Sequence, residues 1–166
     1  MKSVVITGCY GFIGMHVVRA CLRKGWRVYG IDKQTYAANK HCDLFQFCDD
    51  LDLQLLSLKH ADICDLKSIP NCDYVINIAA ETHVGNSIVD STDFIQSNIN
   101  GVKNLLDIIR RKPSNVQSKP ILFHFSTDEV YGDIAEGSFT EESPLNPSNP
   151  YSASKASADM LIKAWA

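Results

Sequence analysis

Apolar and polar positions along this chain follow two alternating patterns. Short runs rich in Val, Ile and other β-branched or aromatic residues are typical of strands buried in a parallel sheet. Longer segments in which apolar residues recur every three or four positions are typical of amphipathic helices. The first pattern predicts strands over residues 3–7, 27–31, 55–59, 74–78 and 121–125. The second pattern predicts helices over residues 12–24, 91–111 and 151–166.

The order of these elements predicts the fold class. Strands that alternate with helices form a parallel sheet covered on both faces, which is the doubly wound, Rossmann-type α/β class. Residues 33–52 carry mixed signals and predict no element, whereas residues 141–150 contain three prolines and predict an extended loop. Ligands of such sheets bind beyond the carboxyl ends of the strands. Candidate functional residues are therefore sought there.

Composition excludes several classes of function. The 166 residues suit one domain, and 16 Lys and Arg against 19 Asp and Glu leave no positive surplus for a nucleic-acid backbone. No apolar run approaches the roughly 20 residues of a membrane-spanning helix. A strand that starts at the third residue leaves no room for a signal peptide, so we expect a cytoplasmic protein with no membrane partner. The six cysteines form no CxxC pair, which disfavours a metal site and predicts reduced, mostly buried thiols.

A glycine-rich loop follows the first predicted strand. Gly8, Gly11 and Gly14 have the spacing GxxGxxG and stand between that strand and the first helix. Such a loop turns tightly and lets a pyrophosphate approach the helix N-terminus, where N–H groups and the helix dipole favour negative charge. Alone, the triplet is also compatible with a turn that serves only packing. In this position it predicts a dinucleotide site that includes Phe12 and Ile13.

The end of the second predicted strand indicates which dinucleotide is bound. Asp32 lies 24 residues after Gly8, where a carboxylate accepts hydrogen bonds from a ribose hydroxyl. The same carboxylate repels a 2′-phosphate, although Lys33 beside it offsets part of that repulsion. The sequence therefore favours NAD over NADP as the cofactor.

A candidate catalytic set follows the fifth predicted strand and opens the last helix. Tyr151 and Lys155 are four residues apart and share one face of that helix. A tyrosine with a pKa near 10 is a poor base, but a neighbouring ammonium and a positive nicotinamide lower that pKa. Thr127 can donate to the same substrate oxygen. Alone, a YxxxK spacing is more often an ordinary helix face, but with the glycine loop it predicts dehydrogenase-type chemistry.

With these motifs together, the chain resembles the extended short-chain dehydrogenase/reductases, and among them the nucleotide-sugar 4,6-dehydratases of the dTDP-glucose or UDP-glucose type. The glycine loop and YxxxK mark only the superfamily, whereas Thr127-Asp128-Glu129 before Val-Tyr-Gly is the specific part. The residues that carry the resemblance are 6–14, 31–33, 35–37, 62–65, 79–84, 87–88, 98, 126–132 and 151–155.

The resemblance implies a role for each of these residues. In this family the sugar C4 hydroxyl is oxidised with Tyr151 as base and NAD as hydride acceptor, water is lost across C5 and C6, and the hydride returns to C6. Glu129 is the implied base at C5 and Asp128 the implied acid for the C6 hydroxyl. Ser87 and Thr127 are the implied substrate contacts. The cofactor contacts implied outside the glycine loop and Asp32 are Lys33, Asp62, Ile63, Ala79, Ala80, Thr82, Asn98, Tyr151 and Lys155.

Three interpretations remain open. The first is a 4,6-dehydratase that acts on a nucleotide sugar, with a deoxysugar such as rhamnose as a natural downstream product. The second is a UDP-glucuronate decarboxylase or a 4-epimerase on the same scaffold, which Asp128 disfavours because those decarboxylases typically carry Ser there. The third is a non-catalytic NAD-binding module.

Length is the largest departure from the family. Members continue past the last predicted helix into a smaller substrate domain. We therefore expect residues 1–166 to form an N-terminal NAD-binding domain that alone turns over sugar slowly or not at all. Many members pair through two helices, which predicts a homodimer through residues 91–111 and 151–166.

Overall fold

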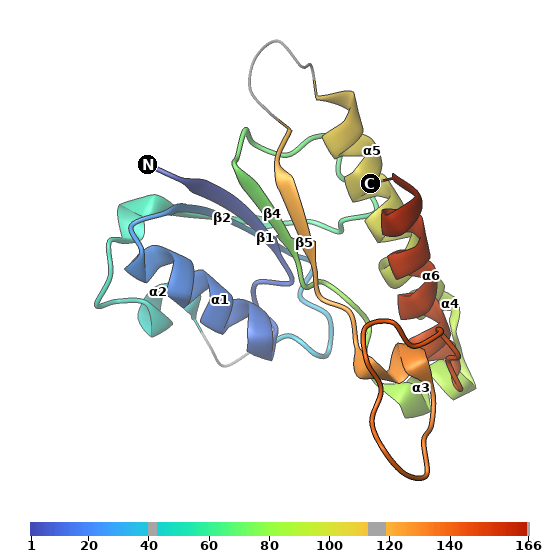
Figure 1. The fold of residues 1–166 in the computed structure, drawn as a ribbon. Coiled ribbons are helices and arrows are strands. Elements are labelled where there is room, and N and C mark those ends of the chain that lie inside the picture. Colours follow the sequence, from blue (N-terminus) through green and yellow to red (C-terminus); the bar gives the residue numbers. More distant parts are fainter. Residues whose placement is uncertain (40–42, 113–118, 166) are drawn as a thin grey trace. The chain divides into compact units, whose positions relative to one another are not determined.

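The computed structural model describes residues 1–39, 43–112 and 119–165, which divide into two compact units. Unit 1 comprises Met1–Ala79 and Asn104–Phe125, and unit 2 comprises Ala80–Lys103 and Ser126–Ala166. Figure 1 shows the helices and strands of both units, coloured along the sequence.

Unit 1 is built on a parallel sheet that has five strands among the described residues, in the order β3-β2-β1-β4-β5 (Figure 1). The strands are β1 (Ser3–Thr7), β2 (Arg27–Asp32), β3 (Leu56–His60), β4 (Tyr74–Asn77) and β5 (Ile121–His124). Thr7 pairs with Ile31 of β2 and with Asn77 of β4, so these three strands end side by side. The chain proceeds from β1 to one side and returns to the other, which places the topological switch point at the end of β1.

Helices cover both faces of this sheet. Alternate residues of a strand face opposite sides. On one face Val4 and Ile6 pack in a core with residues of α1 (Phe12–Arg23), and on the other Val5 packs in a core that includes Leu105 from α5 (Gly101–Arg111). This arrangement confirms the predicted doubly wound α/β class.

The glycine after α1 ends that helix. Gly25 has φ +68°, and its N–H donates to Leu22 O at 2.8 Å, a geometry that closes helices with a left-handed residue. One short helix, α2 (Leu44–Phe47), lies in the stretch 33–52 for which the sequence predicts no element. The 3₁₀ turn η1 (Leu53–Leu55) follows that stretch and overlaps the first residue of the strand predicted over residues 55–59.

Unit 2 is helical. Its elements are α3 (Val84–Val89), α4 (Thr92–Phe94), η2 (Ile95–Asn100), the 3₁₀ turn η3 (Asp128–Tyr131) and α6 (Pro150–Trp165). Helix α6 packs against η2, α3 and η3, so it forms the centre of this unit. The sequence predicts α6 but not α3.

The helix predicted over residues 91–111 contains a π-helical segment, which corrects the predicted apolar face. The segment η2 lies between α4 and α5 and has six residues. A π-helical turn is wider than an α-helical one and changes which residues face inward. Ile95 is therefore 48% exposed, although an apolar residue of an amphipathic helix is expected to face inward, whereas Ser97 and Asn98 are buried.

Further findings concern only the described part of the chain. No helix there is both long and apolar enough to cross a bilayer. In the same ranges no three His, Cys, Asp or Glu side chains gather as metal ligands. The cysteines described there are free thiols and most are buried, as predicted, and Cys42 lies outside the described residues.

Candidate functional site

The glycine loop of unit 1 is held by close backbone packing. Gly8 has φ +72°, and a Cβ there would lie 2.7 Å from the backbone nitrogen of Ala79. A Cβ at Gly14 would lie 1.9 Å from Gly8 O. Gly11 is different, because a Cβ there would meet only Gly8 O, at 3.3 Å, among the described atoms. The loop is therefore packed tightly on its inner side, as a backbone cradle for a pyrophosphate requires.

Gly14→Ala is expected to destabilise unit 1, because its methyl group would overlap the carbonyl of Gly8. Overpacking of this kind costs about 1–3 kcal/mol, and backbone atoms cannot turn away as a side chain can. Urea denaturation followed by circular dichroism measures the loss. The control is Gly85→Ala in α3, where the added methyl meets no described atom within 4 Å and helix propensity favours Ala. Equal stability of both variants would contradict the expectation.

The carboxylate of Asp32 fixes the end of β2 to the glycine loop. Its Oδ2 accepts from Tyr10 N at 2.9 Å, and its Oδ1 accepts from Gln34 N at 2.6 Å. Asp32, which is predicted to bind a ribose hydroxyl, therefore also has a structural role. Its position at the end of a strand in the sequence does not reveal that role.

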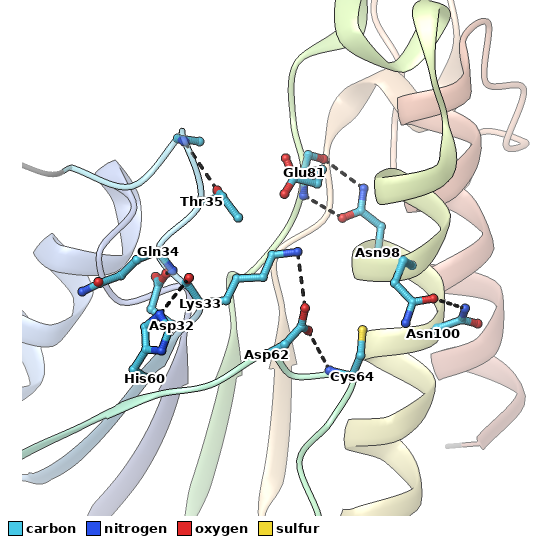
Figure 2. Close-up of polar contacts among 12 residues, drawn as sticks. Asp32, Lys33, Gln34, Thr35, His60, Asp62, Cys64, Glu81, Asn98 and Asn100 are labelled. Carbon is cyan, nitrogen blue, oxygen red and sulfur yellow. Dashed lines mark hydrogen bonds and ion pairs between the residues drawn. The ribbon is translucent and has the colours of Figure 1, made fainter.

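Lys33 and Asp62 form an ion pair in unit 1 (Figure 2). Lys33 Nζ lies 3.5 Å from Asp62 Oδ2, and Cys64 N donates to Asp62 Oδ1 at 2.9 Å. Burial raises the pKa of Asp62, but the hydrogen bonds from Cys64 and the ammonium of Lys33 outweigh burial and hold that pKa below its ordinary value. Asp62 is thus ionised at neutral pH and partly neutralises Lys33.

The other predicted cofactor contacts differ in exposure. Phe12 and Ile13 are 77% and 49% exposed at the start of α1. Ile63 is instead buried in the core of unit 1, where it contributes to packing. Ala79 and Ala80 are half-buried, and Thr82 is exposed.

In unit 2, Thr127 organises the turn that carries the two predicted acid–base residues. Its Oγ1 accepts from Glu129 N at 3.3 Å and lies 3.3 Å from Asp128 Oδ1, to which it can donate. Thr127 is therefore the N-terminal cap of η3. Asp128 is exposed and Glu129 is half-buried, so one short turn presents two carboxylates in different surroundings.

The start of α6 is held by Ser87. Ser87 Oγ accepts from Tyr151 N at 3.1 Å and donates to Val84 O at 2.7 Å. The Tyr151 ring packs edge-on against Phe94, with centroids 6.3 Å apart. Ser87 is only 1% exposed, and both contacts are internal, so in this structure it helps to place Tyr151, and its predicted substrate contact stays a prediction.

The charge states of Tyr151 and Lys155 differ from the simple expectation. Burial, together with the carboxylates of Glu129 and Asp128, raises the pKa of Tyr151, although a hydrogen bond with Thr127 opposes this. Burial also lowers the pKa of Lys155 to about 8, with Asp159 opposing. The polypeptide alone therefore does not supply the predicted lowering of the tyrosine pKa, because burial of the phenol is the larger effect.

Asn98 is a buried residue of unit 2 whose side chain links Glu81 to helix α6. Its Oδ1 accepts from Glu81 N, and its Nδ2 donates to Glu81 O, both at 2.9 Å (Figure 2). The same Nδ2 lies 2.9 Å from Ser154 Oγ of α6. Asn98 is 1% exposed, so the structure shows a bracing role for this predicted cofactor contact.

Sequence reasoning missed two contacts near the predicted catalytic residues. Asn149 Nδ2 donates to Glu129 Oε2 at 3.0 Å, and Ser126 Oγ donates to Asp159 Oδ2 at 2.5 Å. The position of Asn149 at a helix N-terminus had a signal, because Asn directly before Pro is typical there, but its hydrogen bond to Glu129 had none. No local pattern indicates the second.

Comparison with known proteins supports the same family. The family described as GDP-mannose 4,6 dehydratase matches residues 5–166. A probable dTDP-glucose 4,6-dehydratase from Sinorhizobium fredii is 41% identical over 173 residues, which cover 98% of this chain and 48% of the relative. The crystal structure of a dTDP-glucose 4,6-dehydratase from Streptomyces venezuelae with NAD bound has a TM-score of 0.83 and 34% identity, and the match covers 98% of this chain and 51% of that one.

A further structural likeness extends to the fold alone. A UDP-glucuronic acid 4-epimerase from Bacillus cereus has a TM-score of 0.85 at 23% identity, over 98% of this chain and 52% of that one. The chain spans about half the length of the curated relatives that it matches. Since the family match extends over residues 5–166, the chain belongs to the GDP-mannose 4,6 dehydratase family, a family of nucleotide-sugar 4,6-dehydratases.

Proposed function

We propose that this protein dehydrates a nucleotide-linked glucose, dTDP-glucose or UDP-glucose, to the 4-keto-6-deoxy sugar. The observation that carries the proposal is the carboxylate pair of Asp128 and Glu129, presented by one turn that Thr127 caps. Loss of water needs both a base and an acid, whereas epimerisation at C4 does not need this pair. The relatives named as dTDP-glucose 4,6-dehydratases support the assignment.

NAD is the proposed cofactor, and the residues present fit it. The packed glycine loop would hold the pyrophosphate, and Asp32 would bind a ribose hydroxyl. Because Lys33 already pairs with Asp62, its charge offsets less of the repulsion between Asp32 and a 2′-phosphate, which favours NAD over NADP. When bound, NAD supplies the hydride acceptor for oxidation at C4 and a positive charge that lowers the pKa of Tyr151.

The residues of unit 2 then have distinct tasks. Tyr151 takes the proton of the C4 hydroxyl, and Thr127 orients that oxygen. The resulting C4 ketone makes the C5 hydrogen acidic, so Glu129 removes it as a proton. Asp128 donates a proton to the C6 hydroxyl, which leaves as water as the C5–C6 double bond forms. The hydride removed from C4 would then return to C6, and Glu129 would give its proton back to C5, which completes the 4-keto-6-deoxy sugar. The more buried Glu129 is the base and the exposed Asp128 the acid that is re-protonated from solvent.

We also propose that both units act as one NAD-binding domain, residues 1–166, in a cytoplasmic homodimer paired through residues 91–111 and 151–166. In unit 2 the exposed apolar side chains of Ile95, Met160 and Trp165 support such an interface. The free thiols are typical of a reducing compartment. Sedimentation equilibrium of the protein would show a monomer if the proposed pairing is wrong.

The test of the function uses protein from the complete natural coding region. It is given dTDP-glucose, UDP-glucose and UDP-glucuronate in parallel without added cofactor, and the products are weighed by mass spectrometry. We expect loss of one water from one of the two glucose substrates, and the substrate that reacts identifies the nucleotide that the enzyme uses. Loss of carbon dioxide from the glucuronate would overturn the assignment in favour of a decarboxylase. Unchanged substrates with NAD still bound would indicate a binding module.

A further inference from the structure

The side chain of Asn149 connects the N-terminus of α6 with the carboxylate of Glu129. Its Nδ2 donates to Glu129 Oε2 at 3.0 Å, and its Oδ1 accepts from Ser152 N at 2.9 Å. Asn149 N also donates to Ser152 Oγ at 3.2 Å. Both ends of the Asn149 amide are therefore engaged, and all three residues belong to unit 2.

The position of Asn149 as helix cap determines which end of its amide faces Glu129. Asn149 O accepts from Ala153 N at 2.9 Å, and Pro150 occupies the first helical position. A capping Asn must present its oxygen to the helix, because the groups exposed there are N–H donors. Its NH₂ group consequently faces away from the helix, toward Glu129.

We propose that Asn149 is a positioning residue that holds the carboxylate of Glu129 in place, and in its ionised form, as the base at C5. This inference rests on the proposed function. A hydrogen bond donated to a carboxylate favours the charged form, and only that form accepts a proton. With Oε2 held by Asn149, the other oxygen, Oε1, is the atom that takes the C5 proton.

The surroundings of Glu129 explain why such a donor matters. Asp128 precedes it on η3, and the phenol of Tyr151 faces it from α6, where both carboxylates raise the pKa of that phenol. Glu129 thus has two other acidic groups of unit 2 near it, and Asn149 supplies a hydrogen-bond donor to its carboxylate from the cap of α6.

The test uses three variants of the full-length protein. Asn149→Asp keeps a capping oxygen but places a carboxylate oxygen where the donor was. Asn149→Ser keeps the cap without the reach to Glu129, and Asn149→Ala removes both. A hydrogen bond to a charged group predicts a fall in kcat of about 10- to 100-fold in all three, with KM little changed. Melting temperature should fall clearly only in the Ala variant.

The pH profile separates positioning from capping. Asn149→Asp should move the acidic limb of the kcat profile to higher pH by about one unit, because it adds a like charge beside the base. Asn149→Ser should move it less. The control is Asn71→Asp, an equal charge change at an exposed position of unit 1, which should leave rate and profile unchanged.

A readout without catalysis keeps the inference separate from the proposed function. Carbon-13 spectra of the glutamate carboxyl groups, with the Glu129 signal identified from its loss in Glu129→Gln, follow the protonation of this side chain directly. Its titration should move to higher pH in Asn149→Asp and not in Asn71→Asp. If the Glu129 titration is the same in Asn149→Asp as in the parent protein, the inference is wrong, whatever the activity. If the titration moves but the variant of an active parent keeps the parental rate, the inference is also wrong. If the unsubstituted protein removes no water from the sugar, the proposed function is wrong. A moved titration would in that case still support the proposal that Asn149 holds the carboxylate of Glu129.

Discussion

Asp128→Asn and Glu129→Gln are each expected to slow water loss from the nucleotide-glucose by about 10²- to 10⁴-fold, the usual contribution of a positioned acid or base. Neither amide can exchange a proton as the carboxyl group does, although each keeps nearly the same size and polarity. The turn should survive both changes, because the cap of η3 uses the backbone of Glu129 and the hydroxyl of Thr127. Mass spectrometry of the sugar product over time gives the rates.

The matched control is Asp133→Asn, an exposed carboxylate that follows the same turn and has no proposed role. It should react at the parental rate. NAD content, read from the absorbance of cofactor released from the purified protein, should be equal in all variants, because the proposed cofactor residues are unchanged. A rate within threefold of the parent for either Asp128→Asn or Glu129→Gln would remove that residue from the acid–base step.

The sheet was predictable because the residues that favour a strand locally are the same apolar residues that a sheet buried on both faces requires. The strand predicted over residues 3–7 is observed as Ser3–Thr7, since β-branched residues fill both buried faces and Gly8 turns the backbone with φ +72°. The second strand is longer by one residue, Asp32, whose side chain turns back to the loop.

The helical segments of unit 2 were less predictable because distant contacts decide them. Asn98 and Ser97 face inward at the π-helical segment, and Asn98 is satisfied by Glu81, 17 residues away. Hydrophobic periodicity counts such polar residues as exposed. Helix α3 contains Gly85 and Asn86, which are poor helix formers, so no local preference reveals it.

The residues of the candidate site were also predictable only in part. Thr127, Tyr151 and Lys155 are recognisable because chemistry requires those residue types at that spacing. Asn149 and Asp159 act through hydrogen bonds to residues 20 and 33 positions away, and sequence spacing carries no signal for such pairs. Sequence motifs therefore identify the side chains that are proposed to react, whereas the structure is needed to identify the residues that position them.

Lys155→Met is expected to make the fold more stable while it abolishes activity. Lys155 is only 3% exposed, and burial lowers its pKa to about 8 from 10.5. Folding at neutral pH must therefore desolvate an ammonium, a cost that removal of the charge relieves by about 1–3 kcal/mol. Methionine is an unbranched replacement that fits irregular space. Urea denaturation measures the gain, and the control is Lys163→Met at an exposed position of the same helix, which should change stability little.

The pH dependence of this gain identifies its cause. Below pH 8 Lys155 is charged in both the folded and the unfolded state, so the whole desolvation cost is present. Between pH 8 and 10.5 the unfolded chain binds more protons than the folded one, so the free energy of unfolding of the parent rises with pH. The stability advantage of Lys155→Met should therefore shrink across that window and vanish above it. A constant advantage would point to better packing by methionine instead.

A stable variant without activity would show why the chain keeps a costly cation. A group that opposed folding and did nothing else would be expendable, and many hydrophobic replacements at position 155 would serve better. Its charge becomes useful only where a proton must be moved at Tyr151, whose pKa is raised by burial and by the surrounding carboxylates. If Lys155→Met were instead both stable and active, the buried ammonium would have no part in the reaction, and the role assigned to this helix face would pass to Tyr151 and Thr127 alone.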